Sequence, residues 1–389
     1  MQIIVKGTTA CNFHCVYCSE GDKEPVWLDE ALFYKVVDEL PAVIDANHDR
    51  MIRFLWHGGE PLMIGRPRLA HFMDYAITHL SDRYGVHFSM QSNGYLIDEE
   101  WIRFLKKYDV SMGISLDGYP ELHDANRPTR DGGPTAAVVL KNIAAMREAG
   151  IMAGTLMVLN TAEPVDDEKL FNFIYKNHLS PKIHSVIPCG RASARRDTQK
   201  IYDNYVDLLI ALYKRSIMAD EPVIIDPLNE IMNAILGVTP LRECSFNGSC
   251  GREFICLYPD GEMGFCGRDN ASRTFTYGNI REKSLLELYQ SDHAEKIRER
   301  QAYLQTHDCQ NCKDWNLCHG GCSFEAVNAF GSLSYCYPYC ESRRRLLHYL
   351  RTEGLLLMKK RLVDEKRKYR VILQEKQKLL EEVKQYAGE

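Results

Sequence analysis

Thirteen of the fourteen cysteines in this 389-residue sequence fall into two groups. Cys11, Cys15 and Cys18 follow the spacing C-x3-C-x2-C, and ten further cysteines lie between residues 244 and 340. The opening residues lack the apolar run and cleavage site of a signal peptide, so we expect a cytoplasmic protein with reduced thiols. The grouping therefore indicates metal ligation or redox chemistry rather than disulfide bonds.

The overall composition excludes some classes of partner. A formal net charge of -5 gives no reason to expect a nucleic-acid partner. The sequence has no apolar run long enough to predict a membrane span, so we expect no membrane partner. With 45% hydrophobic residues, the chain can bury one large core and a second, smaller domain.

The first half of the sequence has the pattern of an α/β protein. Short β-branched runs alternate with amphipathic helical segments, and the expected strands cover residues 3–6, 51–56, 86–90, 110–116, 152–159 and 182–187. Six such units predict a parallel sheet that curls into a partial (β/α)6 TIM-like barrel over residues 1–235. A cysteine-rich domain with a hairpin at 258–266 is expected over 236–345, and a charged helical tail over 346–389.

Small and polar residues follow five of the expected strands. They are the cysteine loop itself, "HGGEP" at 57–61, "QSNG" at 91–94, "DG" at 117–118 and "PCG" at 188–190. Because the carboxyl ends of parallel strands meet at one edge of a barrel, we expect these loops to form one shared pocket.

Three thiols on one loop fit an iron–sulfur cluster that lacks one protein ligand. A 4Fe-4S cluster usually takes four cysteine thiolates, so three would leave one iron open to a substrate or cofactor. The alternative is a zinc site in which His14 supplies the fourth ligand. His14 directly precedes Cys15, so we expect its side chain to point elsewhere on a tight loop.

The motif with Tyr17 before its last cysteine, placed directly after a first strand, resembles the radical S-adenosylmethionine (SAM) superfamily. The resemblance implies that the open iron binds SAM, whose reductive cleavage gives a 5′-deoxyadenosyl radical that abstracts a substrate hydrogen. It places Gly58, Gly59 and Glu60 near the SAM amino group. It also places Ser115 and Asp117 near the carboxylate and ribose, with Arg127 as a carboxylate partner. Tyr17 and Ile187 would flank the adenine, and Gln91 and Asn93 would face the same cavity.

The later cysteines resemble the SPASM iron–sulfur domain. Cys250-x10-Gly261-x4-Cys266 is followed by Cys309-x2-Cys312-x5-Cys318-x3-Cys322, with Cys336 or Cys340 as the last member. The resemblance assigns Cys244, Cys250, Cys266 and Cys322 to a first auxiliary 4Fe-4S cluster. It assigns Cys309, Cys312, Cys318 and Cys340 to a second, for three clusters in all. Cys256 and Cys336 are then expected to be small buried hydrophobic residues, and a zinc ribbon is the alternative for C-x2-C-x5-C.

The combined resemblance implies an oxidoreductase that acts on a peptide or protein. Our leading expectation is a maturase that forms a carbon–carbon, thioether or ether crosslink in a ribosomally synthesised precursor peptide. The main alternative is an anaerobic sulfatase-maturating enzyme, which oxidises cysteine or serine to formylglycine. Those enzymes place an aspartate base directly after the cysteine that matches Cys266, whereas here Gly267 follows and the nearest acid is Asp269.

Two further alternatives stay open at this point. Cys189 could return a hydrogen atom to a substrate radical, which would make the protein a peptide epimerase. A non-catalytic iron–sulfur scaffold is the other, although it gives no reason for a SAM pocket.

The expected partners follow from this chemistry. They are a precursor peptide and an external electron donor of the flavodoxin or ferredoxin type. Strand one starts within the first few residues, so we expect no N-terminal leader-binding module. Leader binding would then come from a separate leader-recognition protein or from the basic tail, or it would not occur. Residues 341–389 carry 14 Lys and Arg against 8 Asp and Glu.

Overall fold

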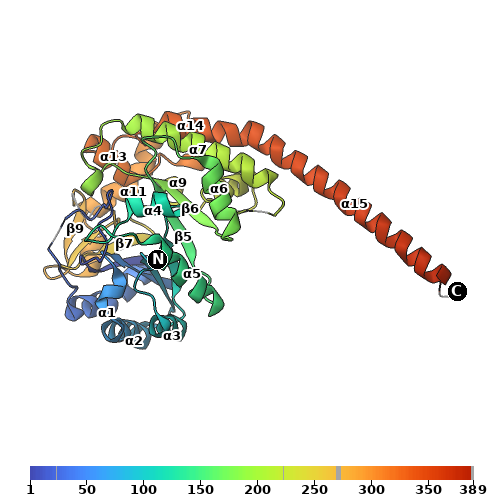
Figure 1. Cartoon of the computed structure of the whole chain (residues 1–389). Coiled ribbons are helices and arrows are strands. Elements are labelled where there is room, and N and C mark those ends of the chain that lie inside the picture. The colour runs from blue at the N-terminus through green and yellow to red at the C-terminus, as the bar shows by residue number, and fades with distance from the viewer. Residues whose placement is uncertain (23, 222, 269–272, 387–389) are drawn as a thin grey trace.

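The computed structural model describes residues 1–22, 24–221, 223–268 and 273–386. Within these residues the strands join into one sheet of order β6-β5-β4-β3-β2-β1-β7-β8-β9 (Figure 1). The strands are β1 (Gln2–Thr8), β2 (Met51–Gly58), β3 (Gly85–Ser92), β4 (Ser111–Ser115), β5 (Gly154–Leu159), β6 (Pro181–Ser185), β7 (Phe254–Leu257), β8 (Glu262–Gly264) and β9 (Thr276–Asn279).

The helices of the barrel half alternate with its strands. They are α1 (Glu30–Ala46), η1 (Pro61–Ile64), α2 (Arg66–Leu80), α3 (Glu99–Lys107), α4 (Pro120–Asn126), α5 (Ala136–Glu148), α6 (Asp167–Lys176), η2 (Gly190–Ala192), α7 (Thr198–Met218) and α8 (Leu228–Ile235). The later helices are α9 (Cys244–Asn247), α10 (Leu285–Tyr289), α11 (Asp292–Thr306), α12 (Trp315–Cys318), α13 (Ser323–Phe330), α14 (Cys340–Tyr349), η3 (Leu350–Gly354) and α15 (Leu355–Tyr386).

The six parallel strands confirm the predicted partial barrel. Each of β1 to β5 pairs in parallel with the next strand in sequence, so that β6 forms the edge of the sheet. The outer helices cover the sheet with apolar side chains. Phe33 of α1 and Phe72 of α2 pack on Trp56 of β2, with ring centroids 5.5 Å from the indole in both cases. Asp98 caps α3 as predicted, because its carboxylate accepts a 2.7 Å hydrogen bond from the Trp101 amide.

The cysteine-rich half does not begin a separate sheet, which differs from the two-domain expectation. β7 pairs in parallel with β1, opposing Ile3 to Ile255, and the predicted hairpin then adds β8 in antiparallel. An unpaired β1 would expose a row of backbone donors and acceptors, and β7 satisfies them. The division at residues 235 and 345 therefore stays a prediction.

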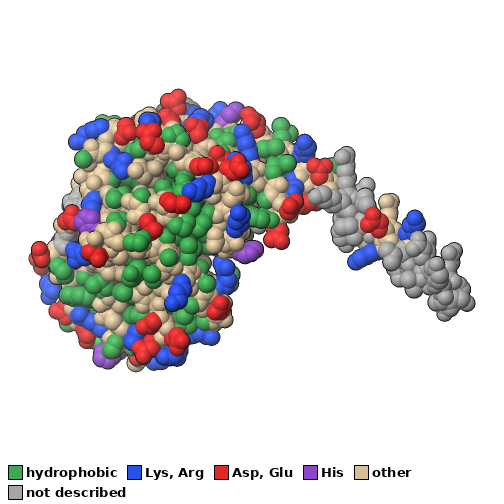
Figure 2. All heavy atoms as spheres, in the orientation of Figure 1, with side chains coloured by type: hydrophobic (Ala, Val, Ile, Leu, Met, Phe, Trp, Pro, Cys, Tyr) green, Lys and Arg blue, Asp and Glu red, His purple; other side chains and the backbone are tan. Residues whose placement is uncertain are grey.

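The C-terminal segment starts its helix earlier than expected. α14 begins at Cys340, runs through the π-helical turn η3 and continues into α15, which projects from the body (Figure 1). Acidic and basic side chains are mixed over the face seen in Figure 2. None of the helices in the described part of the chain has the length and apolar character needed to cross a membrane.

Candidate active site

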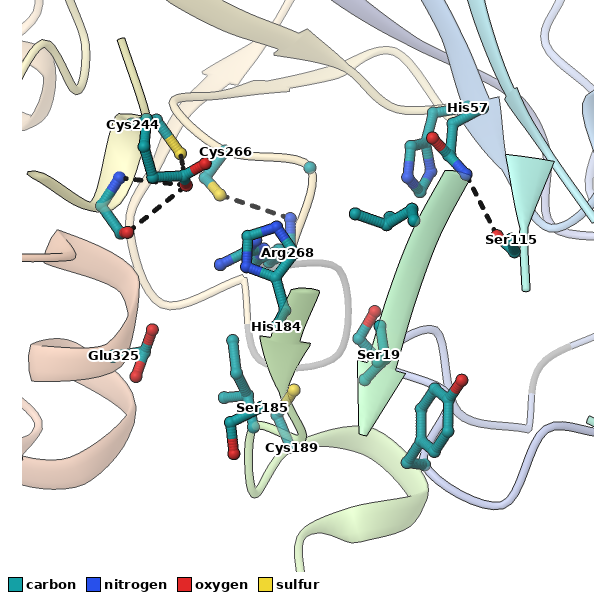
Figure 3. A pocket seen from close by; sticks show the side chains of 18 of the residues that line it. Ser19, His57, Ser115, His184, Ser185, Cys189, Cys244, Cys266, Arg268 and Glu325 are labelled. Atoms are coloured by element: carbon teal, nitrogen blue, oxygen red, sulfur yellow. Dashed lines mark hydrogen bonds between the residues drawn. The ribbon is translucent and has the colours of Figure 1, made fainter. Parts of the chain in front are cut away.

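One cavity of about 430 Å³ joins the two cysteine groups. Its walls come from the inner face of the sheet, from the loops after β1, β2, β3 and β6, and from α7, α9 and α13. Figure 3 shows His57 and Ser115 on one side of this space and Cys244, Cys266 and Glu325 on the other, with His184 and Arg268 between them. Four of the five loops predicted to share a pocket do line it, the exception being "DG" at 117–118, and the cavity also extends to the cysteine-rich half.

The loop after β1 presents Cys11, Cys15 and Cys18 to this cavity. The loop after β6 holds it in place, since the Arg191 amide donates to the Cys18 carbonyl at 3.0 Å. Gly190 makes this approach possible, because a Cβ there would lie 2.2 Å from the Cys18 carbonyl oxygen. His14 is exposed and does not line the cavity, so the zinc site with His14 as fourth ligand is not formed.

Glu60 is a buried carboxylate at the same end of the cavity. One of its oxygens accepts from the Leu62 amide at 3.0 Å and from the Ser92 hydroxyl at 2.8 Å, and the other accepts from the Asn93 amide at 2.8 Å. Burial nevertheless raises the pKa of Glu60 to about 7, because none of the described lysines and arginines forms an ion pair with it. A positively charged ligand would lower that pKa again.

The two glycines before Glu60 serve the cysteine loop more directly than expected. A Cβ on Gly59 would lie 2.0 Å from the carbonyl oxygen of Ala10, which precedes Cys11. The Gly59 and Glu60 amides donate to the carbonyls of Thr8 and Ala10 at 2.8 and 2.7 Å. Gly58 and Gly59 thus bring the "HGGEP" loop against the cysteine loop, and both residues line the cavity.

Asp117 lies beneath the cavity and, unlike the other predicted SAM contacts, does not line it. Its carboxylate accepts hydrogen bonds from the Tyr17 hydroxyl and, at 2.9 Å, from the Val158 amide. Arg127 lies 2.9 Å from the same carboxylate and packs over the Tyr17 ring at 5.3 Å. The contact of Asp117 with SAM stays a prediction. Asp117 orients Tyr17 and Arg127, which do face the cavity.

The other predicted SAM contacts all reach the cavity. Gln91 donates to the Ser115 hydroxyl at 3.1 Å, and Asn93 donates to Asn12 at 2.7 Å. Ile187 lies on the loop after β6, next to Cys189. Their individual roles toward SAM stay predictions.

At the opposite end of the cavity, four cysteines from distant segments come together. Cys244, Cys250 and Cys266 line it, and Cys322 lies buried behind them, close enough to Cys250 and Cys266 to interact electrostatically. These are the four residues predicted for the first auxiliary cluster.

Comparison with known families agrees with both cysteine groups. Residues 5–174 match the model of the Radical SAM superfamily, and residues 244–313 match that of the SPASM iron–sulfur cluster-binding domain. The protein has a radical SAM domain and a SPASM domain.

Similar proteins share this architecture over most of the chain. The cysteine-type anaerobic sulfatase-maturating enzyme of Clostridium novyi is 24% identical over 353 residues, which cover 88% of this chain and 92% of the relative. The serine-type anaerobic sulfatase-maturating enzyme of Klebsiella aerogenes is 24% identical over 335 residues, which cover 85% of this chain and 81% of the relative. The solved structure "Native anSMEcpe with bound AdoMet and Kp18Cys peptide" has the same fold. Its TM-score is 0.78 at 20% identity, and the match covers 92% of this chain and 98% of that one.

The donor set fits the clusters that a radical SAM/SPASM protein implies. Burial raises the pKa of Cys11 to about 12 and that of Cys15 to about 11, so these thiols are protonated unless a metal binds. No group of three or more His, Cys, Asp or Glu side chains in the described ranges is arranged around a single metal ion. The number of clusters stays a prediction.

The second SPASM cysteine group surrounds a smaller pocket of about 20 Å³, and here one expectation is wrong. Cys309, Cys312, Cys318 and Cys340 line it as predicted, but Cys336 lines it too. Cys336 is partly exposed and is hydrogen-bonded to Cys309 and Cys340, so it is not a small buried hydrophobic residue. Cys256, in contrast, is fully buried on β7, as predicted.

The two residues predicted to act on the substrate have different outcomes. Cys189 lines the cavity, and burial raises its pKa to about 12, so it carries a thiol rather than a thiolate. Asp269 lies outside the described residues.

Several ionisable cavity residues of the radical SAM/SPASM protein were not predicted. His57 and His184 point inward from β2 and β6, and Arg268 follows the Cys266 loop (Figure 3). Burial lowers the pKa of His184 to about 4, so the ring is neutral. Glu243, beside Cys244, is paired with Lys182 of β6. The sequence did hold a signal for the two residues on β6. Lys182 and His184 flank Ile183, and alternate residues of a barrel strand face inward, so this pattern predicts two polar side chains on the inner face.

Proposed function

We propose that this chain oxidises a cysteine or serine of a protein substrate to formylglycine, the reaction expected of an anaerobic sulfatase-maturating enzyme, which is the activity that its relatives are named for. This was the alternative to peptide crosslinking, and the relatives favour it because their similarity extends over 85% and 88% of the chain. The observation that supports it most is the single cavity between Cys11, Cys15 and Cys18 and the SPASM thiols. A substrate residue in that cavity would lie between the site of hydrogen abstraction and an electron acceptor.

We assign the cofactors to the residues that the structure brings together. Cys11, Cys15 and Cys18 would hold the cluster that binds SAM, and reductive cleavage of SAM supplies the hydrogen-abstracting radical. Glu60 would accept a hydrogen bond from the SAM amino group. Arg127, held by Asp117, would face the SAM carboxylate. The external flavodoxin- or ferredoxin-type donor stays part of this proposal.

The SPASM thiols would serve the oxidative half of the reaction. A substrate radical must lose one more electron to become an aldehyde or thioaldehyde, and iron–sulfur potentials span a range suitable for accepting it. Cys244, Cys250, Cys266 and Cys322 are the proposed ligands nearest the cavity. Cys309, Cys312, Cys318 and Cys340 would hold a second cluster further from it.

Crosslink formation is the second candidate, and one sequence feature favours it. Gly267 stands where the sulfatase-maturating family has an aspartate base, so the chain lacks that acid at that position. On a cysteine substrate the two functions differ in product: formylglycine formation exchanges the thiol for an aldehyde oxygen, whereas a crosslink removes two hydrogens and leaves no aldehyde.

The experiment is an anoxic incubation of the reconstituted protein with SAM, dithionite and the Kp18Cys peptide. We expect 5′-deoxyadenosine and a peptide whose mass corresponds to the aldehyde. A product that lacks two hydrogens and gives no hydrazine adduct would favour crosslinking. An unchanged peptide would contradict the proposed function.

A further inference from the structure

Glu325 is a buried carboxylate on the wall of the cavity that no part of the SAM site uses. It lies on α13, its residue is 6% exposed, and it lines the cavity on the side of Cys244 and Cys266 (Figure 3). One of its oxygens accepts a 2.6 Å hydrogen bond from the Tyr202 hydroxyl of α7. A buried acid at this place needs an explanation, because burying a carboxylate is costly.

Glu325 has polar neighbours on the cavity wall. The guanidinium of Arg268, which stands in the middle of the cavity, interacts electrostatically with the Glu325 side chain. The Tyr202 hydroxyl occupies an acceptor site on only one of the two Glu325 oxygens. Acceptor sites for a proton from the substrate therefore remain.

The other described carboxylates that line the cavity are already bound. Glu20 and Glu243 each form an ion pair with a lysine. Glu60 accepts three protein hydrogen bonds at the SAM end. Glu325, in contrast, accepts its hydrogen bond from a neutral tyrosine, and its charged neighbour Arg268 stands in the cavity itself.

The position after Cys266 has little room for a side chain of its own. A Cβ on Gly267 would lie 3.2 Å from Ile4 Cγ2 and 3.3 Å from Lys6 Cε, because β1 packs against this loop. β1 therefore crowds the place where the sulfatase-maturating family has its aspartate. Among the described residues, a proton acceptor for the same reaction is found on another wall of the cavity.

We propose that Glu325 accepts the proton that the substrate residue loses during its oxidation, an inference that rests on the proposed function. After a hydrogen atom has been removed from the substrate Cβ, the radical carbon still carries its thiol or hydroxyl group. The thiol or hydroxyl proton passes to the Glu325 carboxylate, and one electron passes to an acceptor of the iron–sulfur class. A carbon–sulfur or carbon–oxygen double bond forms, and water replaces the sulfur with release of hydrogen sulfide.

The position of Glu325 suits this step. Cys322, a proposed ligand of the first auxiliary cluster, caps α13 three residues earlier, so proton and electron leave the substrate toward the same helix. If the proton and the electron leave the substrate together toward α13, the buried substrate residue does not acquire a net charge, which would be costly. Tyr202 is then a positioning residue that holds the carboxylate.

Glu325→Gln tests the charge without removing the side chain, since its amide oxygen still accepts from Tyr202. The probe is Kp18Cys deuterated at the cysteine Cβ. We expect deuterium transfer to 5′-deoxyadenosine to continue, while aldehyde formation falls about 100-fold to 10,000-fold, the range of general-base catalysis. Binding of fluorescent Kp18Cys, measured by anisotropy, should stay within about twofold of wild type, because the deficit lies in kcat.

Three further variants make the test specific. Glu299→Gln, an exposed change on α11, should behave as wild type. Glu325→Asp should recover part of the aldehyde yield. The inference would be overturned if Glu325→Gln still formed the aldehyde at the wild-type rate. It would also be overturned if Glu20→Gln lost aldehyde formation while Glu325→Gln kept it. Either result would leave the proposed function unaffected. An unmodified peptide with the wild-type protein would overturn both.

Discussion

Binding of SAM should depend on the ionisation of Glu60. The carboxyl is buried, and its pKa is raised from 4.5 to about 7 by desolvation. A SAM amino group that donates to it requires the ionised form. Since one pH unit below the pKa leaves about one carboxyl in ten ionised, the dissociation constant of SAM should rise about tenfold between pH 8 and pH 6.

Glu60→Gln should remove that pH dependence. The variant loses a charge-assisted hydrogen bond worth about 1.5 to 3 kcal/mol, so SAM should bind about 10-fold to 100-fold more weakly at pH 8. Titration calorimetry of the anoxic, reconstituted protein measures both effects, and Glu148→Gln on the exposed face of α5 is the matched control. Titration of SAM itself affects all variants equally. An identical pH slope in wild type and Glu60→Gln would refute the reasoning.

Three further predictions concern groups around the cavity. Asp117→Asn leaves the buried Arg127 without its charge partner, so the free energy of unfolding from urea denaturation should fall by about 3 to 5 kcal/mol; a change below 1 kcal/mol, about the worth of an exposed pair, would contradict this. Cys340→Ser should lower the iron content of the reconstituted protein by one cluster, whereas Cys336→Ser should not; the reverse result would exchange their roles. Cys189→Ala should leave oxidised product unaffected, while loss of solvent-deuterium incorporation into the peptide would instead support epimerisation.

The barrel and its cofactor end could be predicted from local sequence. Strands with apolar β-branched runs and Asp98 as a helix cap are decided by residues close in the chain, so β1 to β6 were found within a few residues of their ends. The three cysteines of the first loop lie within eight positions, and their spacing alone puts three thiols on one loop. Gly59 and Glu60 were found for a related reason, since a loop after a parallel strand faces the barrel mouth.

Other features could not be predicted, because packing between distant segments decides them. Asp117 has the sequence context of a ligand contact. In the structure, its carboxylate is bound by Arg127 and by the Tyr17 hydroxyl and lies under the cavity. Cys336 was left over once the SPASM spacing had assigned eight cysteines to two clusters. Only the path of residues 331–340 in the folded chain brings it beside Cys309.

The sequence by itself determined the chemistry of the two cysteine groups, because ligand spacing along a loop is a local property. Only the tertiary structure decided that they share one cavity. Pairing of β7 with β1 joins segments about 250 residues apart, since an open strand edge needs a partner. The same pairing crowds the space after Cys266, and among the described residues Glu325, from a helix far along the chain, is the carboxylate that we propose as proton acceptor.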